Sequence, residues 1–467
     1  MPPGAEARAR LGPALVVLAA VGLAYANALS ASFQFDDFEV IVRDPRVQSL
    51  GAWWHSLPGI RPLLKLSYAL GHASGFGVVG FHAFNVAVHG IAGLLVLELV
   101  RRRALGSGAD PGAATRISLA TALLFTLHPV QTEAVTYASG RSASLCVALA
   151  LASILTWVRG RDQDRRRVEL VYLASPCLML LALGVKESAV VVPGVLMLWI
   201  AADPGRPFRF LAALRETAAH WIALLLALVA GLSMPAYQSF VETSLATRSP
   251  AENLVAQVHG VAYLLGQLVR IDRLNADPAL AAMTTWDASG ILLAIALLGA
   301  VGLALVGLRR WPLAGFAVLW TVIWLLPTNS LLARLDLVND RQWYGALLGP
   351  ALLLALSLER LSRRTRSGAR FALAVLVLVG GITTHRRNDV YRDEILFWSD
   401  VIEESPHNAR AFNNLGIALA EHCDLPGAER TWRRALELDP GFVRAAVNLR
   451  LLIEGHSYAD KCRPDDA

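Results

Sequence analysis

Eleven apolar segments, separated by short polar links, fill the first 384 residues of this 467-residue chain. Over the whole chain, 55% of the residues are hydrophobic and only 17% are charged, whereas about a quarter of the residues of a soluble domain are charged. A helix that crosses a bilayer needs roughly 20 predominantly apolar residues. The sequence therefore predicts an all-α, polytopic membrane protein of about eleven spans.

The predicted spans are 11–31, 79–100, 117–130, 142–158, 169–185, 189–203, 217–235, 290–308, 312–327, 344–359 and 371–384. The first of them has the pattern of a cleavable signal, but ten further apolar segments follow it, so we expect it to remain as a span. Residues 252–270 place polar side chains at helical spacing among apolar ones. That pattern predicts an amphipathic helix at the membrane interface rather than a twelfth span.

The arginines decide the predicted topology. With the amino terminus in the cytoplasm and 252–270 excluded, every arginine cluster of the membrane unit falls on the cytoplasmic side, as the positive-inside rule requires. These clusters are 101–103, 159–167, 206–215, 309–310 and 360–370. Eleven spans then place the carboxyl-terminal tail outside the cytoplasm. The Ala, Arg and Leu bias suggests a bacterial inner membrane with a periplasmic tail, and the net charge of +6 reflects topology rather than nucleic-acid binding.

The composition changes after residue 384, so we predict a membrane domain over 1–384 and a helical domain over 385–467. Residues 409–442 fit one tetratricopeptide repeat, which is about 34 residues long. Small residues at Gly416 and Ala428 suit the crossing of its two helices. One repeat cannot bury its apolar face alone, so we expect helices near 389–404 and 443–453 to flank it, or the membrane unit to support it.

The chain has four cysteines and no spacing typical of a structural zinc site. Cys146 and Cys177 lie inside apolar segments. Any disulfide would therefore join Cys423 to Cys462.

Two adjacent carboxylates, Asp36 and Asp37, follow the first span directly. Carboxylates so close to hydrocarbon are costly and suggest a function, such as a general base that accepts a proton from an attacking hydroxyl. A solvated loop or a helix cap is the structural alternative. A divalent metal could bind this pair, but the sequence offers no further ligand, so we predict no metal and no cofactor.

His82, Asn85 and His89 share one helix face. That pattern allows metal ligation but favours packing between helices.

Three cations lie at the outer ends of predicted spans, namely Arg141, Lys186 and Arg341. Each alone could be a snorkelling anchor. Together they suit the phosphate of a lipid. Lys186 is followed by Glu187, which could form a local ion pair with it or serve as its partner in a phosphate site.

The order of motifs resembles that of the membrane O-mannosyltransferases with tetratricopeptide repeats, within the multi-span (GT-C type) glycosyltransferases that use lipid-phosphate sugars. The shared motifs are F-x-F-D-D, R-P-L, G-F-H-x-x-N-x-x-x-H, L-H-P-V-x-T-E-A-V, G-R-S, K-E and D-R-x-x-Y. Two features depart from the family pattern: only one clear repeat is present, and Gln342-Trp343 follows the last-loop arginine.

The resemblance implies a role for each motif. Asp36 or Asp37 would act as the catalytic base or orient the acceptor hydroxyl, and Arg141, Lys186 and Arg341 would hold the donor phosphate. The residues expected to line the pocket are His128, Glu133, Glu187, Tyr344 and Arg61.

The predicted function is transfer of a sugar, with mannose expected, from a polyprenyl-phosphate donor to a hydroxyl, with a protein Ser or Thr expected, outside the cytoplasm. The partners would be that donor, membrane lipid and a protein that binds the repeat, without nucleic acid. The alternative is a membrane-anchored repeat scaffold for envelope assembly without catalysis. A transporter would instead place charged or broken helices at mid-membrane.

Overall fold

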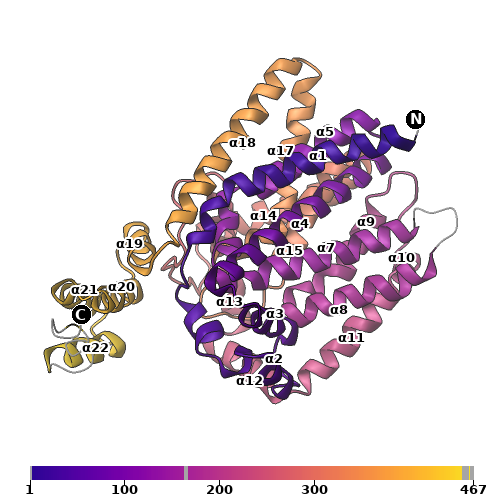
Figure 1. Cartoon of the computed structure of the whole chain (residues 1–467). Helices are drawn as coiled ribbons and strands as arrows, with labels where there is room; N and C mark the ends of the chain where they lie inside the picture. Colours follow the sequence, from indigo (N-terminus) through magenta and orange to yellow (C-terminus); the bar gives the residue numbers. More distant parts are fainter. Residues whose placement is uncertain (1–2, 162–166, 455–461, 463–467) are drawn as a thin grey trace.

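A computed structural model describes residues 3–161, 167–454 and 462 of the chain. The described part is built from helices, and it contains no strand. Figure 1 shows a bundle of long helices with a smaller group of helices, α19–α22, projecting from one side. We call this group the tail. The predicted all-α class, a membrane helix bundle with a small helical domain, is confirmed.

The first half of the bundle contains α1 (Pro3–Ala24), α2 (Leu50–His55), α3 (Pro62–Ala73), α4 (Gly77–Gly106), α5 (Pro111–Thr126), α6 (Thr132–Val135), α7 (Arg141–Arg161), α8 (Ser175–Val185), α9 (Val192–Ala201) and α10 (Phe210–Glu216). The second half contains α11 (Ala218–Leu232), α12 (Pro235–Thr247), α13 (Pro250–Gln267), α14 (Ala288–Arg310), α15 (Pro312–Leu325), α16 (Trp343–Ala346), α17 (Leu348–Ser362) and α18 (Arg366–Asp389). Short 3-10 or π turns lie at Ala26–Ser30, Phe38–Val42, Pro45–Val47, Pro129–Gln131, Ala138–Gly140, Leu170–Ala174, Glu187–Val191 and Asp340–Gln342.

The apolar helices correspond one to one to the predicted spans. In the described residues, α4, α7, α14 and α18 are each long and apolar enough to cross a membrane. Three further candidates are helix pairs bent by 55°, 70° and 57°, at α5–α6, α10–α11 and α16–α17. Four shorter apolar helices complete the set, at Leu11–Ala24, Leu170–Val185, Glu187–Ala201 and Pro312–Leu325.

The outer surface of the bundle is apolar over whole helices. On α14, Leu298, Leu303 and Val306 are 71%, 77% and 80% exposed. On α18, Phe371 and Leu378 are also largely exposed. Contiguous apolar surface of this extent marks contact with lipid or another protein. The protein is therefore an integral membrane protein.

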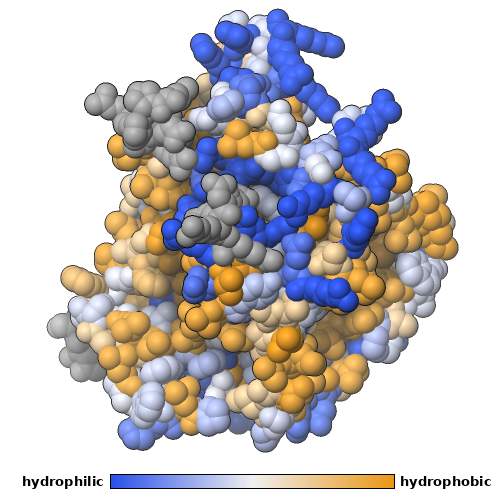
Figure 2. Space-filling model, turned by 90° about the vertical axis from the view of Figure 1, so that its right-hand side faces the viewer, coloured by the Kyte–Doolittle hydropathy of each residue, from blue (hydrophilic) through white to orange (hydrophobic). Residues whose placement is uncertain are grey.

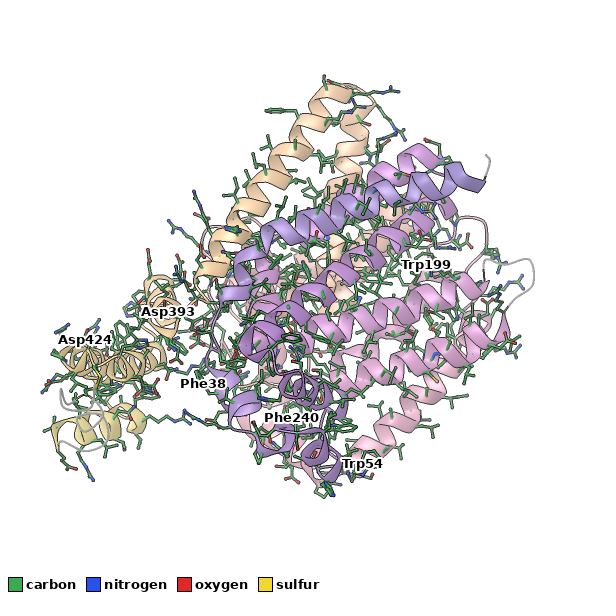
Figure 3. All side chains as sticks on the ribbon, in the orientation of Figure 1. Phe38, Trp54, Trp199, Phe240, Asp393 and Asp424 are labelled. Carbon is green, nitrogen blue, oxygen red and sulfur yellow. A yellow bond between two sulfur atoms is a disulfide. The ribbon has the colours of Figure 1, made fainter. Side chains whose placement is uncertain are left out.

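Arginines from several of the predicted cytoplasmic clusters, in the described part of the chain, gather at one end of the bundle, which we call the arginine end (Figure 1). Arg103 on α4 donates to the carbonyl of Trp199 on α9 at 3.1 Å, and Arg159 on α7 lies 3.9 Å from Glu98. These contacts bring the carboxyl ends of α4, α7 and α9 together. In Figure 3, Trp199 lies at this end, whereas Phe38, which follows the acidic pair, lies on the side of Asp393 in the tail.

Helix α13 falls in the segment predicted to lie at the interface, and it does not qualify as a span among the described helices. Its polar side chains face the protein rather than water. Asn253 donates to the carbonyl of Ser330 at 2.8 Å, and Gln257 donates to that of Leu337 at 3.2 Å. Leu254 and Leu265 are exposed instead. The helix therefore uses its polar face to hold the loop that precedes α16.

The tail consists of α19 (Glu394–Glu404), α20 (Ala409–Glu421), α21 (Leu425–Leu438) and α22 (Val443–Ile453). Helices α20 and α21 form the predicted repeat. A Cβ atom on Gly416 would collide with the indole of Trp432, which explains the small residue at this crossing. Helix α18 continues past residue 384 to Asp389, so the last span leads into the tail without a loop at the predicted domain boundary.

The tail rests on the end of the bundle that is opposite the arginine end, and we call this the tail end. Trp398 and Phe397 of α19 form one buried cluster with Ala31 and Tyr137 of the bundle. Arg410 at the start of α20 forms ion pairs with Asp277 and Asp336, which lie in two loops of the bundle. Arg387 of α18 pairs with Asp400 at 2.6 Å. The membrane unit therefore supports the repeat, together with α19 and α22.

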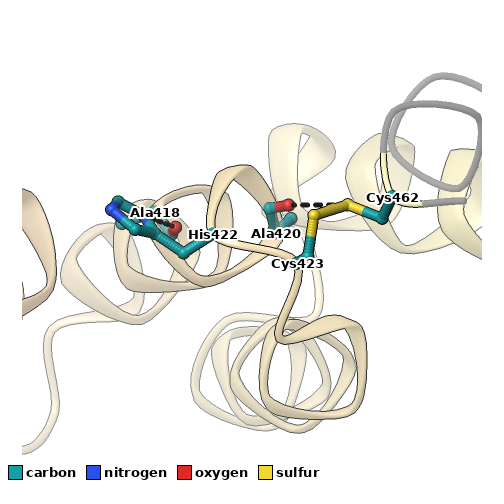
Figure 4. Close-up of a disulfide and its surroundings, with 5 residues drawn as sticks. All are labelled: Ala418, Ala420, His422, Cys423 and Cys462. Carbon is teal, nitrogen blue, oxygen red and sulfur yellow. Dashed lines mark hydrogen bonds between the residues drawn. A yellow bond between two sulfur atoms is a disulfide. The ribbon is translucent and has the colours of Figure 1, made fainter. Parts of the chain in front are cut away.

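A disulfide joins Cys423 to Cys462, as predicted for any disulfide of this chain, with their Cα atoms 5.5 Å apart. Figure 4 shows Cys423 just after the end of α20, beside Ala420. Cys146 is a buried free thiol and Cys177 an exposed one. Disulfides persist in oxidising compartments such as the periplasm.

Replacing Cys423 by Ser should destabilise the tail. The disulfide closes a loop with a sequence separation of 39 residues, and the lost constraint on the unfolded chain corresponds to about 4 kcal/mol. Hydrogen exchange of α20–α22 should report this loss, and Cys177→Ser is the matched control. If thiol alkylation without reductant modified Cys423 and Cys462 in the native protein, the disulfide would be absent and the prediction wrong.

Candidate functional site

The acidic pair lies at the tail end of the bundle, in the segment between α1 and α2. Phe35, just before it, has a φ of +39°. Arg61, at the start of α3, has a φ of +50°. Residues other than glycine adopt such angles only where their surroundings hold them, and they cluster at functional sites. Both lie beside the charged groups described next.

Asp37 holds the backbone of this segment. Its side chain is fully buried, and its two carboxylate oxygens accept hydrogen bonds from the backbone N–H groups of Ser139 at 2.7 Å and Gln34 at 3.0 Å. Burial nevertheless raises the pKa of Asp37 to about 7. With both oxygens occupied by backbone amides, Asp37 serves to fix the loop.

Asp36 is the freer carboxylate of the pair. It is partly exposed, and its backbone N–H donates to the hydroxyl of Tyr137 at 2.8 Å. Burial raises the pKa of Asp36 above its ordinary value, while the positive charges of Arg341 and Arg410 oppose the rise. Asp36 therefore offers an accessible carboxylate with cations nearby.

Arg341 is fixed by Glu133. The guanidinium Nε lies 2.8 Å from one carboxylate oxygen of Glu133, and the backbone N–H of Arg341 donates to the other at 3.0 Å. The guanidinium also lies over the ring of Tyr137, 5.4 Å from its centre. Glu133 thus aligns Arg341 beside Asp36, and the structure brings these three predicted residues together.

Arg61 and Glu187 form a two-pronged ion pair between segments that are 126 residues apart in the sequence. The Nε and Nη2 atoms of Arg61 donate to the Glu187 carboxylate at 3.0 and 2.7 Å. Tyr237 of α12 also donates to Glu187, at 3.3 Å. Because Glu187 pairs with Arg61, it does not clasp its neighbour Lys186 in the sequence.

Lys186 lies in a group of cations. Burial lowers the pKa of its ammonium to about 7, helped by the positive charges of Arg334, Arg341 and Arg61. Within the described part of the chain, no ion pair or hydrogen bond holds this ammonium. These four cations repel one another, and a group of this kind suits an anion such as phosphate.

Arg334 was missed by the sequence analysis. It lies in the loop between α15 and α16, and its Nη1 is buried without a hydrogen-bond partner among the described residues. Burial, together with the positive charges of Arg341 and Arg61, lowers its pKa to about 10. Its only sequence signal is a single cation among Leu331, Leu332 and Leu335.

A membrane-facing apolar groove adjoins this cation group. Its volume is about 520 Å³, and it runs between α8, α11 and α12 up to Glu187. Its lining includes Leu180, Leu224, Leu228 and Met234. The arrangement places the cation group at the end of an apolar groove, with a carboxylate close by.

Comparisons with known proteins found relatives along most of the chain. It is 27% identical over 489 residues to protein O-mannosyl-transferase TMTC4 of Mus musculus, covering 88% of this chain and 64% of that protein. It is 23% identical to protein O-mannosyl-transferase F38B6.6 of Caenorhabditis elegans, covering 92% of this chain and 63% of the relative. Protein O-mannosyl-transferase Tmtc3 of Drosophila melanogaster is 24% identical and matches 93% of this chain. The predicted resemblance to tetratricopeptide-repeat O-mannosyltransferases is confirmed, because the chain is similar to these proteins over most of its length.

The similarity covers only part of each relative. The chain spans 64%, 63% and 56% of the lengths of these three relatives. No family model matches the chain, and no solved structure matches it.

Arg141, which the family resemblance assigns to the donor phosphate, is hydrogen-bonded to other groups of the protein. It is fully buried on α7, and its guanidinium donates to Asn85 Oδ1, the Ser67 carbonyl and the Phe81 carbonyl at 2.7, 2.9 and 2.9 Å. It also lies 4.5 Å from the ring centre of Phe84. The structure does not bring Arg141 into the cation group around Lys186.

Arg141→Leu should therefore reduce stability rather than donor affinity. The change leaves the buried Asn85 Oδ1 without a donor, at a cost of about 1–3 kcal/mol, and it removes the second donor of the helix carbonyls of Ser67 and Phe81. Thermal unfolding of the purified protein should show the loss, and Arg141→Lys should restore part of it. A variant that unfolds normally but binds the donor weakly would restore the phosphate role.

The side chains of His128 and Tyr344 also form hydrogen bonds within the protein. Nδ1 of His128 accepts from the backbone N–H of Val130, and its Nε2 lies 3.3 Å from the carbonyl of Leu268. Tyr344 is fully buried, and its hydroxyl lies 2.8 Å from Nδ1 of His89. The other nitrogen of His89 lies 3.0 Å from the carbonyl of Thr126. His89 thus links α4 to α5 and α16, as expected for packing between helices.

The described residues contain no group of three or more His, Cys, Asp or Glu side chains placed to hold a metal ion. The absence of a metal or cofactor stays a prediction.

Proposed function

We propose that this protein transfers mannose from a polyprenyl-phosphate donor to the hydroxyl of a protein Ser or Thr, outside the cytoplasm. One observation carries the proposal: Asp36 lies beside Arg341, which belongs to a group of four cations with Arg61, Lys186 and Arg334 at the end of an apolar groove. The names of the relatives assign O-mannosyl transfer to those proteins. The groove suits a prenyl chain, and the cations suit its phosphate.

The reaction is a single inverting displacement. The acceptor oxygen attacks the anomeric carbon of the sugar while the bond from that carbon to the phosphate oxygen breaks. The polyprenyl phosphate leaves with the electron pair, and its negative charge is stabilised by Lys186, Arg334 and Arg341. Asp36 accepts the proton of the acceptor hydroxyl. Glu133 keeps Arg341 aligned, and Glu187 does the same for Arg61.

The proposed location is a bacterial inner membrane with the tail in the periplasm. The arginine clusters at the end opposite the tail support this orientation, and so does the Cys423–Cys462 disulfide. The tail stands next to Asp36 through Arg410, which pairs with Asp336 at 2.8 Å. A protein acceptor held by the repeat would therefore be presented to the site.

The test uses the full-length protein in nanodiscs with radiolabelled polyprenyl-phosphate mannose and Ser- or Thr-containing peptides. We expect transfer to peptide from this donor and none from the water-soluble nucleotide sugar. Transfer from the nucleotide sugar alone would overturn the lipid donor. No transfer from either donor to any peptide or extracted envelope protein would favour the non-catalytic scaffold.

A further inference from the structure

A second hollow lies at the arginine end, far from the acidic pair. It is a groove with a volume of about 640 Å³, and it lies where α5, α17 and α18 meet. Cationic side chains form its rim, namely Arg116, Arg363, Arg366 and Arg370. Figure 2 shows this end of the molecule, with hydrophilic residues gathered at the top and centre and hydrophobic surface below and at the sides.

The charge of this groove is positive and only partly compensated. Four arginines face two carboxylates, and both carboxylates already have partners. Glu359 accepts two hydrogen bonds from Arg116, at 2.9 and 2.6 Å, while Asp110 caps α5 through the N–H of Ala113 at 2.9 Å. Arg363, Arg366 and Arg370 are exposed, and they form no ion pair within the described part of the chain.

The floor of the groove is apolar and continues toward the lipid-facing surface. Leu119 and Ala120 of α5, Leu358 of α17 and Leu373 of α18 line it. Phe371 on α18 is 72% exposed next to this groove. A water-soluble anion would need only the rim, whereas a lipid needs both a cationic rim and an apolar floor.

We propose that this groove binds one anionic phospholipid, with its phosphate between Arg363, Arg366 and Arg370 and its acyl chains along the floor between α5 and α18. Basic pockets between spanning helices suit anionic headgroups, and arginine holds phosphate through paired N–H donors. The site lies in the leaflet opposite the acidic pair and is independent of the proposed transfer reaction. A bound lipid there would fill the space between α18 and the bundle.

The test compares lipid retention by three forms of the full-length protein. The wild type, the groove variant Arg363→Gln/Arg366→Gln/Arg370→Gln and the control variant Arg206→Gln/Arg209→Gln/Arg215→Gln are purified from membranes. The control removes the same number of arginines near the same end but outside the groove. Each is equilibrated with mixed phosphatidylglycerol and phosphatidylcholine micelles, and bound lipid is counted by native mass spectrometry. Thermal unfolding confirms that each form is folded.

We expect the wild type and the control to retain one phosphatidylglycerol in preference to phosphatidylcholine. The groove variant should bind it more weakly by roughly fivefold for each arginine, on the order of a hundredfold in all. An equal loss in both variants would overturn the site, because general surface charge would explain it. Complete displacement by inorganic phosphate would overturn the lipid and indicate a soluble anion.

Discussion

Asp36→Asn should reduce the turnover number by about a hundredfold or more while the protein stays folded and binds its donor normally. A positioned general base contributes roughly 10²–10⁴-fold to such a reaction, and asparagine cannot accept the proton. Both carboxylate oxygens of Asp37 accept hydrogen bonds from backbone N–H groups, which leaves Asp36 as the carboxylate of the pair that can accept the proton. Initial rates of transfer at saturating donor, together with the donor KM, measure the effect.

Asp37→Asn is the matched control, and we expect a different failure. Its carboxylate accepts from the N–H groups of Gln34 and Ser139, and an amide nitrogen placed at one of these positions leaves a buried donor unpaired, at a cost of about 1–3 kcal/mol. Stability should fall, and any activity loss should follow the folded fraction. If folded Asp37→Asn were inactive and Asp36→Asn active, the two roles would be reversed.

Much of the bundle could be predicted from hydropathy because each span is a separate apolar segment. The rejection of 252–270 as a span rested on its polar side chains at helical spacing and on the positions of the arginines. The bends could not be predicted, since hydropathy carries no angle: the chain turns by 55° between α5 and the helical residues 129–135. The inward polar face of α13 was also hidden, because Asn253 and Gln257 bind backbone carbonyls that only the folded loop supplies.

The site was only partly predictable, for a related reason. A cation at the end of a span has the same sequence signal whether it faces lipid, a ligand or the protein interior. Arg141 and Arg341 were therefore both interpreted as ligands of the donor phosphate. The guanidinium of Arg141, however, donates its hydrogen bonds to Asn85, Ser67 and Phe81. Glu187 pairs with Arg61, which is 126 residues away in the sequence. Because Lys186 is the neighbour of Glu187 in the sequence, this long-range pair was not predicted. Arg334 carries no motif at all.

Donor binding should weaken as the pH rises above about 7, and Lys186 should be the cause. Burial and the positive charges of Arg334, Arg341 and Arg61 lower the pKa of this ammonium to about 7. A bound phosphate stabilises the charged form, so affinity is greatest below that pKa and falls about tenfold per pH unit above it. The arginines keep their charge in this range, and the donor phosphodiester does not titrate there.

Lysine at this position is a notable choice in this chain, because only three of its 43 lysine and arginine residues are lysines. Lys186→Arg should keep donor affinity and remove the pH dependence of KM, since arginine stays charged. Lys186→Gln should raise the donor KM by about 10–100-fold, the value of one charge-assisted hydrogen bond. Lys65→Gln, a lysine near Asp44 and Arg46, is the control and should change neither. A KM that kept its pH dependence in Lys186→Arg would assign that dependence to another group, with Asp37 the first to test because burial raises its pKa to about 7.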